Sequence, residues 1–448
     1  MVGDLLRELK QAIRALVRAP GYATITAATL AVGIGWTTAV FSVVSAVLVD
    51  PLGYPDPEEL VVVGGQLPGL GSQDLTASAP EYRDYLEASE TLEDLAATWI
   101  LDVNVTGLDQ PFRSRDAVVT VNFFSMIGVE PVMGRDFTPE DAGGDIGNTA
   151  ILSYAGWQRY FGADPNVIGR TFLIDDDPIE VIGVMPAGFE HPEAGTGDPV
   201  AIWGPIDVSE ESRFGQGRNA RNWTLFGRLA DGVSREVAQS EFEAIASSLR
   251  QTYPDAYPAE TRWTTSVVSL KERIVGPVRL SLMLVLGAAG FVLLIACSNV
   301  ANLMLARGSE RTRSIALRGA LGASRMEQAR GLILEGLAIS VLGGALGIAI
   351  AAMGTRVVRA GSAAQLPRLQ GVGVDGTVLG FSALLTIGTA LIVASIPAVR
   401  LTRLNLQDVL RQGSRAGSNN RRAQNTLVVV EIAFSILLLV GSGLTLKS

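Results

Sequence analysis

Residues that commonly do chemistry are scarce in this 448-residue chain, and their spacing excludes most catalytic sites. The chain has one histidine, His191, and one cysteine, Cys297, so neither a histidine pair nor an intrachain disulfide can form. A nucleotide-binding P-loop needs Gly-Lys followed by Ser or Thr, whereas the three lysines, Lys10, Lys271 and Lys447, each follow a leucine. The sequence therefore predicts no catalytic residue, no cofactor site and no metal site in the chain itself.

Acidic residues are abundant, and they could suggest either a calcium site or the carboxylate pair of a hydrolase. Asp175 to Asp177 could suggest a calcium loop, but the alternating ligands and closing Glu of an EF-hand are missing. A solvated turn is what this pattern favours. An extracytoplasmic hydrolase would use an Asp/Glu pair, yet so many carboxylates make chance pairs certain. Their presence does not by itself indicate an enzyme.

A basic loop at 307–335 separates two uncharged runs, 280–306 and 336–355. Each run is long enough to cross a bilayer, given a rise of ~1.5 Å per residue and a hydrocarbon core of ~30 Å. Short loops rich in arginine stay in the cytoplasm. This loop contains six arginines, namely Arg307, Arg311, Arg313, Arg318, Arg325 and Arg330. Membrane topology alone could account for them, as charges that face the cytoplasm and the lipid headgroups.

The same loop contains signals for helix ends. Ser324 is followed three residues later by Glu327 and then by an apolar run, which is the pattern of a capping box. It predicts a helix that starts near Arg325 and continues into the next span. Gly322 suits the left-handed turn that ends a preceding helix, predicted near 311–321. A short basic helix held between two spans could transmit a push from a cytoplasmic partner.

The segment SIALRGALGASR, residues 314–325, resembles the loop signature of FtsX/MacB-type ABC transporter permeases. In that family the loop docks on the ATPase subunit, and for this chain we expect the ATPase, which binds the ATP, on a partner chain. The resemblance implies that the ATPase-coupling residues are Arg311, Arg313, Ser314, Ile315, Leu317, Arg318, Leu321 and Gly322. One departure concerns Ser314, because the family usually has Glu at this position.

Charge is distributed unevenly along the chain, which indicates a membrane protein whose acidic residues lie mainly on one side of the membrane. Residues 50–276 hold 37 of the 45 acidic residues but only 15 of the 36 basic residues. This predicts an acidic extracytoplasmic domain and a basic cytoplasmic side, and it argues against nucleic-acid binding. The predicted segments are spans at 19–49, 280–306, 336–355, 376–399 and 427–446 (truncated), an outer loop at 356–375 and a cytoplasmic linker at 400–426.

Residues 1–18 predict an amphipathic helix on the cytoplasmic membrane surface, with Leu5, Leu9, Ala12, Ile13 and Leu16 at helical spacing. A cleaved signal peptide is the alternative, but the helix and the apolar run after it are too long. Gly33 and Gly35 in the first span predict close helix packing, and Gly343, Gly344 and Gly347 in the third are expected on or near one face of that helix. Asn299 and Asn302 would hydrogen-bond between helices or line a path.

Residues 50–276 predict an α+β domain between the first two spans. Strands are expected at 60–63, 117–120 and 263–270, and helices at 81–91, 122–127 and 234–252, the last with Ser234 as its cap. A hairpin is expected at 171–184 with the Asp run and Pro178 in its turn. Segments such as PLGYPDPEELV and NFFSMIGVEPVMGRDF resemble the MacB-type periplasmic core domain. The resemblance implies two subdomains, one inserted into the other at about 130–220.

The last segment, RRAQNTLVVVEIAFSILLLVGSGLTLKS, resembles the start of the second half of duplicated MacB-like permeases, closest to the acidobacterial "orphan" type whose ATPase is not fused. The resemblance implies a bacterial inner-membrane permease with a cytoplasmic N-terminus. Its expected partners are membrane lipid, an ABC ATPase, a second permease half or a second copy, and a periplasmic adaptor. The alternative is a membrane scaffold or receptor that regulates an extracytoplasmic partner without transport.

Overall fold

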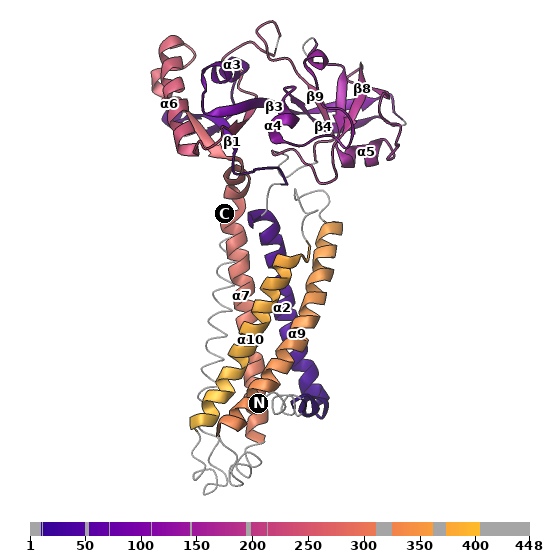
Figure 1. The fold of residues 1–448 in the computed structure, drawn as a ribbon, viewed down its shortest axis with the longest axis vertical. Coiled ribbons are helices and arrows are strands. Elements are labelled where there is room, and N and C mark those ends of the chain that lie inside the picture. Colours follow the sequence, from indigo (N-terminus) through magenta and orange to yellow (C-terminus); the bar gives the residue numbers. More distant parts are fainter. Residues whose placement is uncertain are drawn as a thin grey trace. The chain divides into compact units, whose positions relative to one another are not determined.

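The computed structural model describes residues 10, 12–49, 53–70, 72–108, 110–143, 146–193, 199–212, 214–310, 325–361 and 373–403. They fall into two compact units, whose elements are labelled in Figure 1. Of the described residues, the membrane unit contains those up to Val49, those from Leu280 to Gly361 and those at 373–403, and the extracytoplasmic unit contains those at 53–279.

Four long helices build the membrane unit: α2 (Pro20–Val44, extended by a π-helical turn over Ser45–Val49), α7 (Leu270–Glu310), α9 (Arg325–Gly361) and α10 (Gly376–Arg403). Each is long and apolar enough to cross a membrane, over Pro20–Leu48, Val278–Arg307, Ile333–Val357 and Gly376–Ser395. These are the four complete spans that the sequence predicts. Helix α7 begins earlier than expected, so the predicted domain end at Gly276 lies inside a helix. The predicted fifth span, 427–446, lies outside the described residues.

Helices α2 and α9 approach closely at glycines. A Cβ on Gly35 would lie 2.8 Å from the Gly347 carbonyl oxygen, and one on Gly343 would lie 2.8 Å from the Leu30 Cβ. Neighbouring membrane helices gain little from the hydrophobic effect, because lipid is as apolar as they are, so contact at small residues drives their packing. Gly344 meets Thr386 of α10 in the same way. The predicted close packing at Gly35 is thus confirmed, whereas the three predicted glycines of α9 do not share one face, because Gly343 and Gly347 meet α2 and Gly344 meets α10.

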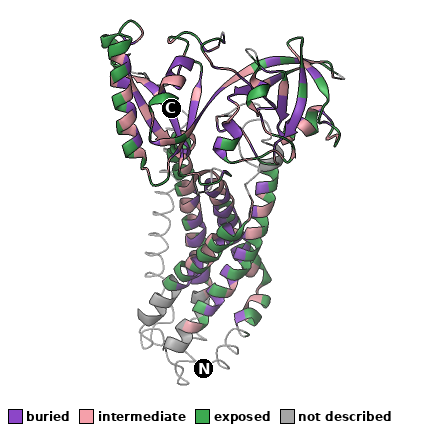
Figure 2. Cartoon of the chain, turned by 45° about the horizontal axis from the view of Figure 1, so that its top comes forward, coloured by how far each residue is buried: buried purple, intermediate pink, exposed green. Residues whose placement is uncertain are grey.

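Larger apolar side chains lie on both sides of this contact. Leu30 and Ile34 of α2 form a buried cluster with Val300 of α7, Ile339 of α9 and Val393 of α10. Other large apolar side chains are exposed on the helices, among them Val32, Leu280, Val341 and Leu384. Figure 2 shows this alternation of buried and exposed residues along the helices. An apolar outer surface of this kind suits a lipid environment.

Hydroxyl groups add polar contacts between the spans. The Thr37 hydroxyl donates to the Ala289 carbonyl of α7 at 3.1 Å, and Thr38 shares a hydrogen bond of 2.9 Å with Ser382 of α10. The asparagines do not contribute as predicted. Asn299 is exposed, because α7 turns Val300 toward the other helices, and Asn302 Oδ1 has no hydrogen-bond partner among the described residues.

An eleven-stranded sheet forms the extracytoplasmic unit, with its main path in the order β11-β1-β10-β3-β4-β9-β6-β8-β5. β2 pairs with β1, and β7 pairs with both β3 and β8. The strands are β1 (Leu60–Leu67), β2 (Ser72–Leu75), β3 (Leu92–Thr106), β4 (Phe112–Val119), β5 (Met133–Gly134), β6 (Thr149–Leu152), β7 (Thr171–Ile174), β8 (Asp177–Val184), β9 (Ile202–Pro205), β10 (Thr224–Leu229) and β11 (Thr264–Ser269).

One half of the sheet is covered on both faces, which explains its continuous apolar strands. Val61 and Val63 of β1 pack in a cluster with residues of α3 (Ala79–Ala88) and α6 (Arg235–Thr252). Leu60 and Val62, on the opposite face, pack in a second cluster with α4 (Phe123–Ile127). Figure 2 shows these strands largely buried.

The other half of the sheet closes into a ring. β3, β4, β9, β6, β8 and β7 pair in sequence, and the ring closes because β7 pairs with both β8 and β3. A third cluster fills its interior, including Val103, Ala150, Phe172, Val181 and Ile202. Four of the six strands in this ring, β6, β7, β8 and β9, come from residues 149–205, inside the segment that the sequence predicts as an inserted subdomain.

Local predictions for this unit hold with three corrections. Strand β4 covers Phe112–Val119, so it begins five residues before the predicted strand at 117–120. Helix α3 begins at Ala79 rather than Glu81, because Ser78 is its N-cap in a capping box with Glu81, and it ends at Ala88 rather than Thr91. Pro178 lies in β8 opposite Leu173, not in the hairpin turn. The turn needs only Asp175 and Asp176, both of which have positive φ.

A carboxyl group faces the interior of the ring. Asp116 lies opposite Leu101 and Ser114 opposite Val103, so they share the face that packs in the third cluster. The Ser114 hydroxyl donates to Asp116 Oδ1 at 2.5 Å, while Oδ2 has no partner among the described residues. Burial, which disfavours the charged form, raises the pKa of Asp116 to about 7.

Gly343→Ala should destabilise the membrane unit, because its Cβ would lie 2.8 Å from the Leu30 Cβ. Overpacking costs ~1–3 kcal/mol of stability. This cost is as large as or larger than the roughly 1 kcal/mol by which Ala is favoured over Gly inside a helix. We expect a lower midpoint of thermal unfolding in detergent. Gly380→Ala on α10 is the matched control, since nothing lies within 4 Å of its Cβ, and its midpoint should be unchanged or higher. Equal midpoints for the two variants would contradict this packing.

Asp116→Asn should alter how stability depends on pH. The pKa of Asp116 is raised from 3.8 in the unfolded chain to about 7, so its contribution is fully present below pH ~4 and is lost as pH rises through ~7. Above pH 7 the variant should therefore be more stable than wild type. The gain in unfolding free energy is a few kcal/mol at most, because each unit of pKa difference corresponds to about 1.4 kcal/mol.

The measurement is the unfolding midpoint of the full chain at each pH from 4 to 8, with tryptophan fluorescence as the signal that monitors unfolding. The control is Asp102→Asn, because Asp102 is about half exposed and pairs with Arg113 on the surface. A wild-type curve parallel to that of Asp116→Asn would refute the assignment.

Candidate functional site

The residues predicted to couple to an ATPase lie outside the part of the chain that the structure describes. This applies to Arg311, Arg313, Ser314, Ile315, Leu317, Arg318, Leu321 and Gly322, and to the predicted cap Ser324. Glu327 lies in α9, which is helical from Arg325 onward into the third span, in line with the prediction for this helix. The structure does describe both ends of the basic loop.

The two ends of the loop meet in an ion pair. Arg307, in the last turn of α7, donates through Nη1 to Glu335 Oε1 of α9 at 3.0 Å. Both side chains are largely buried, with 13% and 7% of their surface exposed. Removing one partner of such a pair leaves an uncompensated buried charge, which costs about 3–5 kcal/mol. The pair therefore fixes α7 and α9 relative to each other where the loop leaves and re-enters the helices.

Arg307 also contacts the N-terminal part of the membrane unit. Its Nη2 donates to the Ala15 carbonyl at 2.9 Å, and its guanidinium lies 4.3 Å from the centre of the Tyr22 ring. Ala15 belongs to the N-terminal helix, which is described for residues 12–17, and Tyr22 lies in the first turn of α2. Four segments of the chain thus meet at one guanidinium.

The predicted N-terminal amphipathic helix packs only partly as expected. Leu16 packs against the buried cluster of the membrane helices, and Ala12 is buried. Ile13, assigned to the same apolar face by its spacing, is 49% exposed. The helix therefore turns Ala12 and Leu16 inward, toward the side on which Arg307 holds the Ala15 carbonyl.

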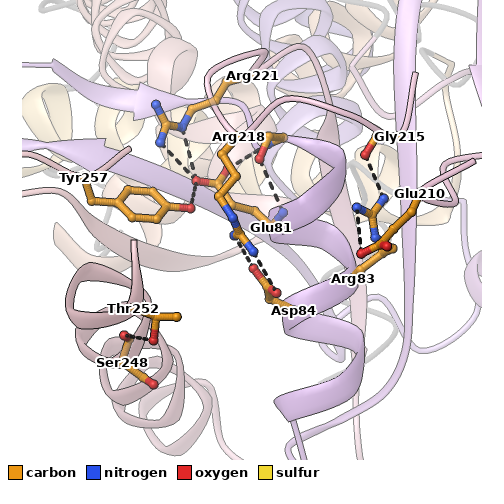
Figure 3. Close-up of polar contacts among 11 residues, drawn as sticks. Glu81, Arg83, Asp84, Glu210, Gly215, Arg218, Arg221, Ser248, Thr252 and Tyr257 are labelled. Atoms are coloured by element: carbon orange, nitrogen blue, oxygen red, sulfur yellow. Dashed lines mark hydrogen bonds and ion pairs between the residues drawn. The ribbon is translucent and has the colours of Figure 1, made fainter. Parts of the chain in front are cut away.

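A second polar cluster lies in the extracytoplasmic unit, around α3 (Figure 3). The Glu81 carboxylate accepts from the Arg221 guanidinium at 3.1 Å, from the Tyr257 hydroxyl at 2.9 Å and from the Ser78 backbone N–H at 2.7 Å. Glu81 is 1% exposed, and its carboxylate is well supplied with donors. Burial and the nearby Glu81 raise the pKa of Tyr257 above its ordinary value.

Neighbouring pairs extend this cluster. Arg218 pairs with Asp84 and lies 3.6 Å from the centre of the Tyr253 ring, and Arg83 donates to the Gly215 carbonyl at 2.9 Å. The cluster joins α3 to the loop before β10 and to the residues that follow α6, as Figure 3 shows. Because these charged groups are paired with one another, the cluster holds loops together rather than presenting a free group for catalysis.

The single histidine and the aspartate turn support no catalytic site among the described residues. His191 is 1% exposed, its Nε2 is hydrogen-bonded to the Thr98 hydroxyl at 3.0 Å and its ring stacks on Phe123. Asp175 Oδ1 accepts from the side-chain amide of Asn104 in the neighbouring strand β3 at 2.9 Å. Within the described part of the chain, no group of three or more His, Cys, Asp or Glu could hold a metal ion.

Sequence reasoning missed the contacts at the ends of the loop. Arg307 was counted only among the topology-determining arginines, and Glu335 only marked the end of the loop. A usable signal was present, because a lone Glu directly before an uncharged span needs a partner if it is buried. Ala15 and Tyr22 carried no such signal, since neither a backbone carbonyl nor an aromatic ring near a membrane surface is unusual.

Comparisons with known families match two parts of the chain. Residues 23–245 match the MacB-like periplasmic core domain, and residues 286–406 match the FtsX-like permease C-terminal domain. The periplasmic region of MacB from Actinobacillus actinomycetemcomitans, a solved structure, covers 49% of the chain at 13% identity, with a TM-score of 0.36.

Curated relatives include the macrolide export ATP-binding/permease protein MacB of Burkholderia thailandensis, 28% identical over 51% of this chain, and that of Salmonella paratyphi A, 24% identical over 74%. The chain spans 33% and 50%, respectively, of the length of these two relatives. The order of the two family matches agrees with the two units and with the four spans. The chain is therefore a membrane protein of the MacB/FtsX permease family, with a MacB-like extracytoplasmic domain followed by an FtsX-like permease domain.

Proposed function

We propose that the chain is the permease subunit of an ABC transporter of the mechanotransmission type. A separate ATPase binds the basic loop at 307–335, and ATP-driven movement of that loop changes the extracytoplasmic domain. The domain then exports or extracts a drug, peptide or lipid substrate from the outer side of the bacterial inner membrane. ATP binds to the partner, and the chain itself carries no cofactor.

The observation that best supports this proposal is the extent of α7, which belongs to both units. Near its start, Leu270 and Ile274 pack in an apolar cluster of the extracytoplasmic unit. Further along, Cys297 and Val300 pack in the cluster of the membrane helices, and Arg307 then begins the basic loop. A helix anchored in both cores can carry a displacement from the loop to the outer domain.

The described spans offer little support for a solute path through the membrane core. The hydroxyls of Thr37 and Thr38 are used in contacts between helices, while buried oxygens of Ser298, Asn302 and Ser340 have no hydrogen-bond partner among the described residues. The charged residues Arg307 and Glu335 lie where the loop begins and ends, and they pair with each other. Acidic, basic or histidine residues inside a helix bundle mark most polar pathways through membranes, and the described spans contain none within 20–48, 280–306, 336–355 or 376–395. Action on a substrate at the outer side fits these helices better.

The charge distribution supports a cytoplasmic N-terminus and loop. The extracytoplasmic segment is strongly acidic, while the remaining chain is basic. Transporters of this type work as two permease halves, so we expect a second copy or a second half-permease as a partner, with a periplasmic adaptor as a further partner.

Replacing Leu317, Arg318 and Leu321 together with alanine should abolish stimulation of the partner ATPase. We expect wild type to co-purify in detergent with one ATPase of the source organism and to raise its ATP hydrolysis, whereas the triple variant should do neither. The control is Arg356→Ala, which removes an exposed charge near the other end of α9 and should leave binding and stimulation intact.

Normal stimulation by a well-folded triple variant would contradict the assignment of the loop. If no ATPase binds the folded wild-type chain, the permease proposal fails, and a scaffold or receptor that acts on an extracytoplasmic partner takes its place. Ser314→Glu, which restores the usual family residue, would then show whether this departure prevents docking.

A further inference from the structure

We propose that Arg307 couples the N-terminal helix to the basic loop at 307–335, so that movement of the loop acts on α2 as well as on α7 and α9. This inference rests on the proposed permease function. It adds to the loop signature a contact, made by Arg307, that links the loop to the N-terminal helix. Arg307 would be a positioning residue, because it acts through the helices that it joins.

The geometry at Arg307 joins four segments through one side chain. Nη1 bonds Glu335 of α9 at 3.0 Å, Nη2 bonds the Ala15 carbonyl at 2.9 Å, and the guanidinium lies against the Tyr22 ring of α2. Arg307 itself lies in α7. A displacement of the loop end of α7 or α9 must therefore either move the N-terminal helix or break these contacts.

The contact to Ala15 occurs at the end of the N-terminal helix. Ala19 N–H donates to the Leu16 carbonyl at 3.0 Å, so the Ala15 carbonyl does not receive the usual bond from Ala19. Carbonyls at a helix C-terminus carry partial negative charge and favour a cation. Arg307 supplies that cation from a distant part of the chain, and it thereby caps the helix.

Only arginine can make these three contacts at once. Its planar guanidinium presents separate donors to Glu335 and Ala15, while its flat surface can stack on an aromatic ring such as Tyr22. Lysine would place one compact charge near Glu335 and could not hold all three partners together. A lysine variant should thus keep the ion pair but loosen the N-terminal helix.

The connection from this helix to the outer domain runs through α2. Only Arg18 and Ala19 separate the helical residues 12–17 from α2. Helix α2 contacts α9 at Gly35 and Gly347 without room for a side chain, and such close contact at small residues favours association of the two helices. The first span should therefore respond to the loop together with the second and third spans.

The test uses the full chain in lipid nanodiscs, with Cys297 replaced by alanine so that spin labels can be placed. Labels at Arg14→Cys, an exposed position on the N-terminal helix, and Leu337→Cys, 38% exposed on α9, report the distance between the two helices. With the wild-type pair we expect one narrow distance distribution. Arg307→Met with Glu335→Leu, which removes both charges together, should at least double its width.

Two further variants make the result specific. Arg307→Lys should broaden the distribution to an intermediate width while keeping the charge. Thr38→Val with Ser382→Ala removes the hydrogen bond between α2 and α10 and leaves the loop ends untouched, so its distribution should match wild type. An unchanged width in both Arg307 variants would overturn the proposal.

The functional readout uses the ATPase that co-purifies with the wild-type chain. The double variant at 307 and 335 should bind it within about threefold of wild type, because the loop signature is intact, yet stimulate hydrolysis at least tenfold less. Full stimulation despite a broadened distance would show that the N-terminal helix plays no part in coupling and would overturn the inference. If the wild-type chain binds no ATPase, the permease proposal fails instead, while the spin-label widths still decide whether Arg307 holds the helix.

Discussion

The membrane unit depends on the close approach of α2 and α9, where the backbones of Gly35 and Gly347 meet. Lipid removes most of the hydrophobic driving force between apolar helices, so stability must come from short contacts along the helix axes. Glycine provides them because no Cβ keeps the backbones apart. The buried cluster of Leu30, Ile34, Val300 and Val393 forms around this contact, which positions α7 and α10 as well.

The extracytoplasmic unit is surrounded by water, so its stability depends on burying apolar residues away from solvent. Its sheet is covered by helices in one half and closes on itself in the other, so that few apolar residues face solvent in either half. Ion pairs such as Arg221 with Glu81 then hold the connecting loops against the helices. An apolar cluster of this unit includes Leu270, the first residue of α7, the helix that also enters the membrane cluster.

Features with a local physical cause were predictable. Uncharged runs long enough to cross a bilayer identified the four spans, and Ser234 identified the start of α6 because a serine hydroxyl can accept from a free N–H in the first turn. The hairpin at 171–184 was predictable from its aspartates, although Pro178 was misplaced because the turn needs only two residues. The start of α3 was misplaced by two residues because the Ser78–Glu81 capping box was not considered.

By itself, the sequence determined the class of protein, the number of complete spans, the position of the large outer domain and the basic loop, because each depends on composition or on neighbours in the chain. Only the tertiary structure decided that β7 closes a ring with β3, that Asp116 faces the interior of that ring, and that Arg307 pairs with Glu335 while capping the N-terminal helix. These contacts join residues from about 15 to nearly 300 positions apart. No periodicity or local motif encodes such partners, since they are selected by how the packed helices and strands meet.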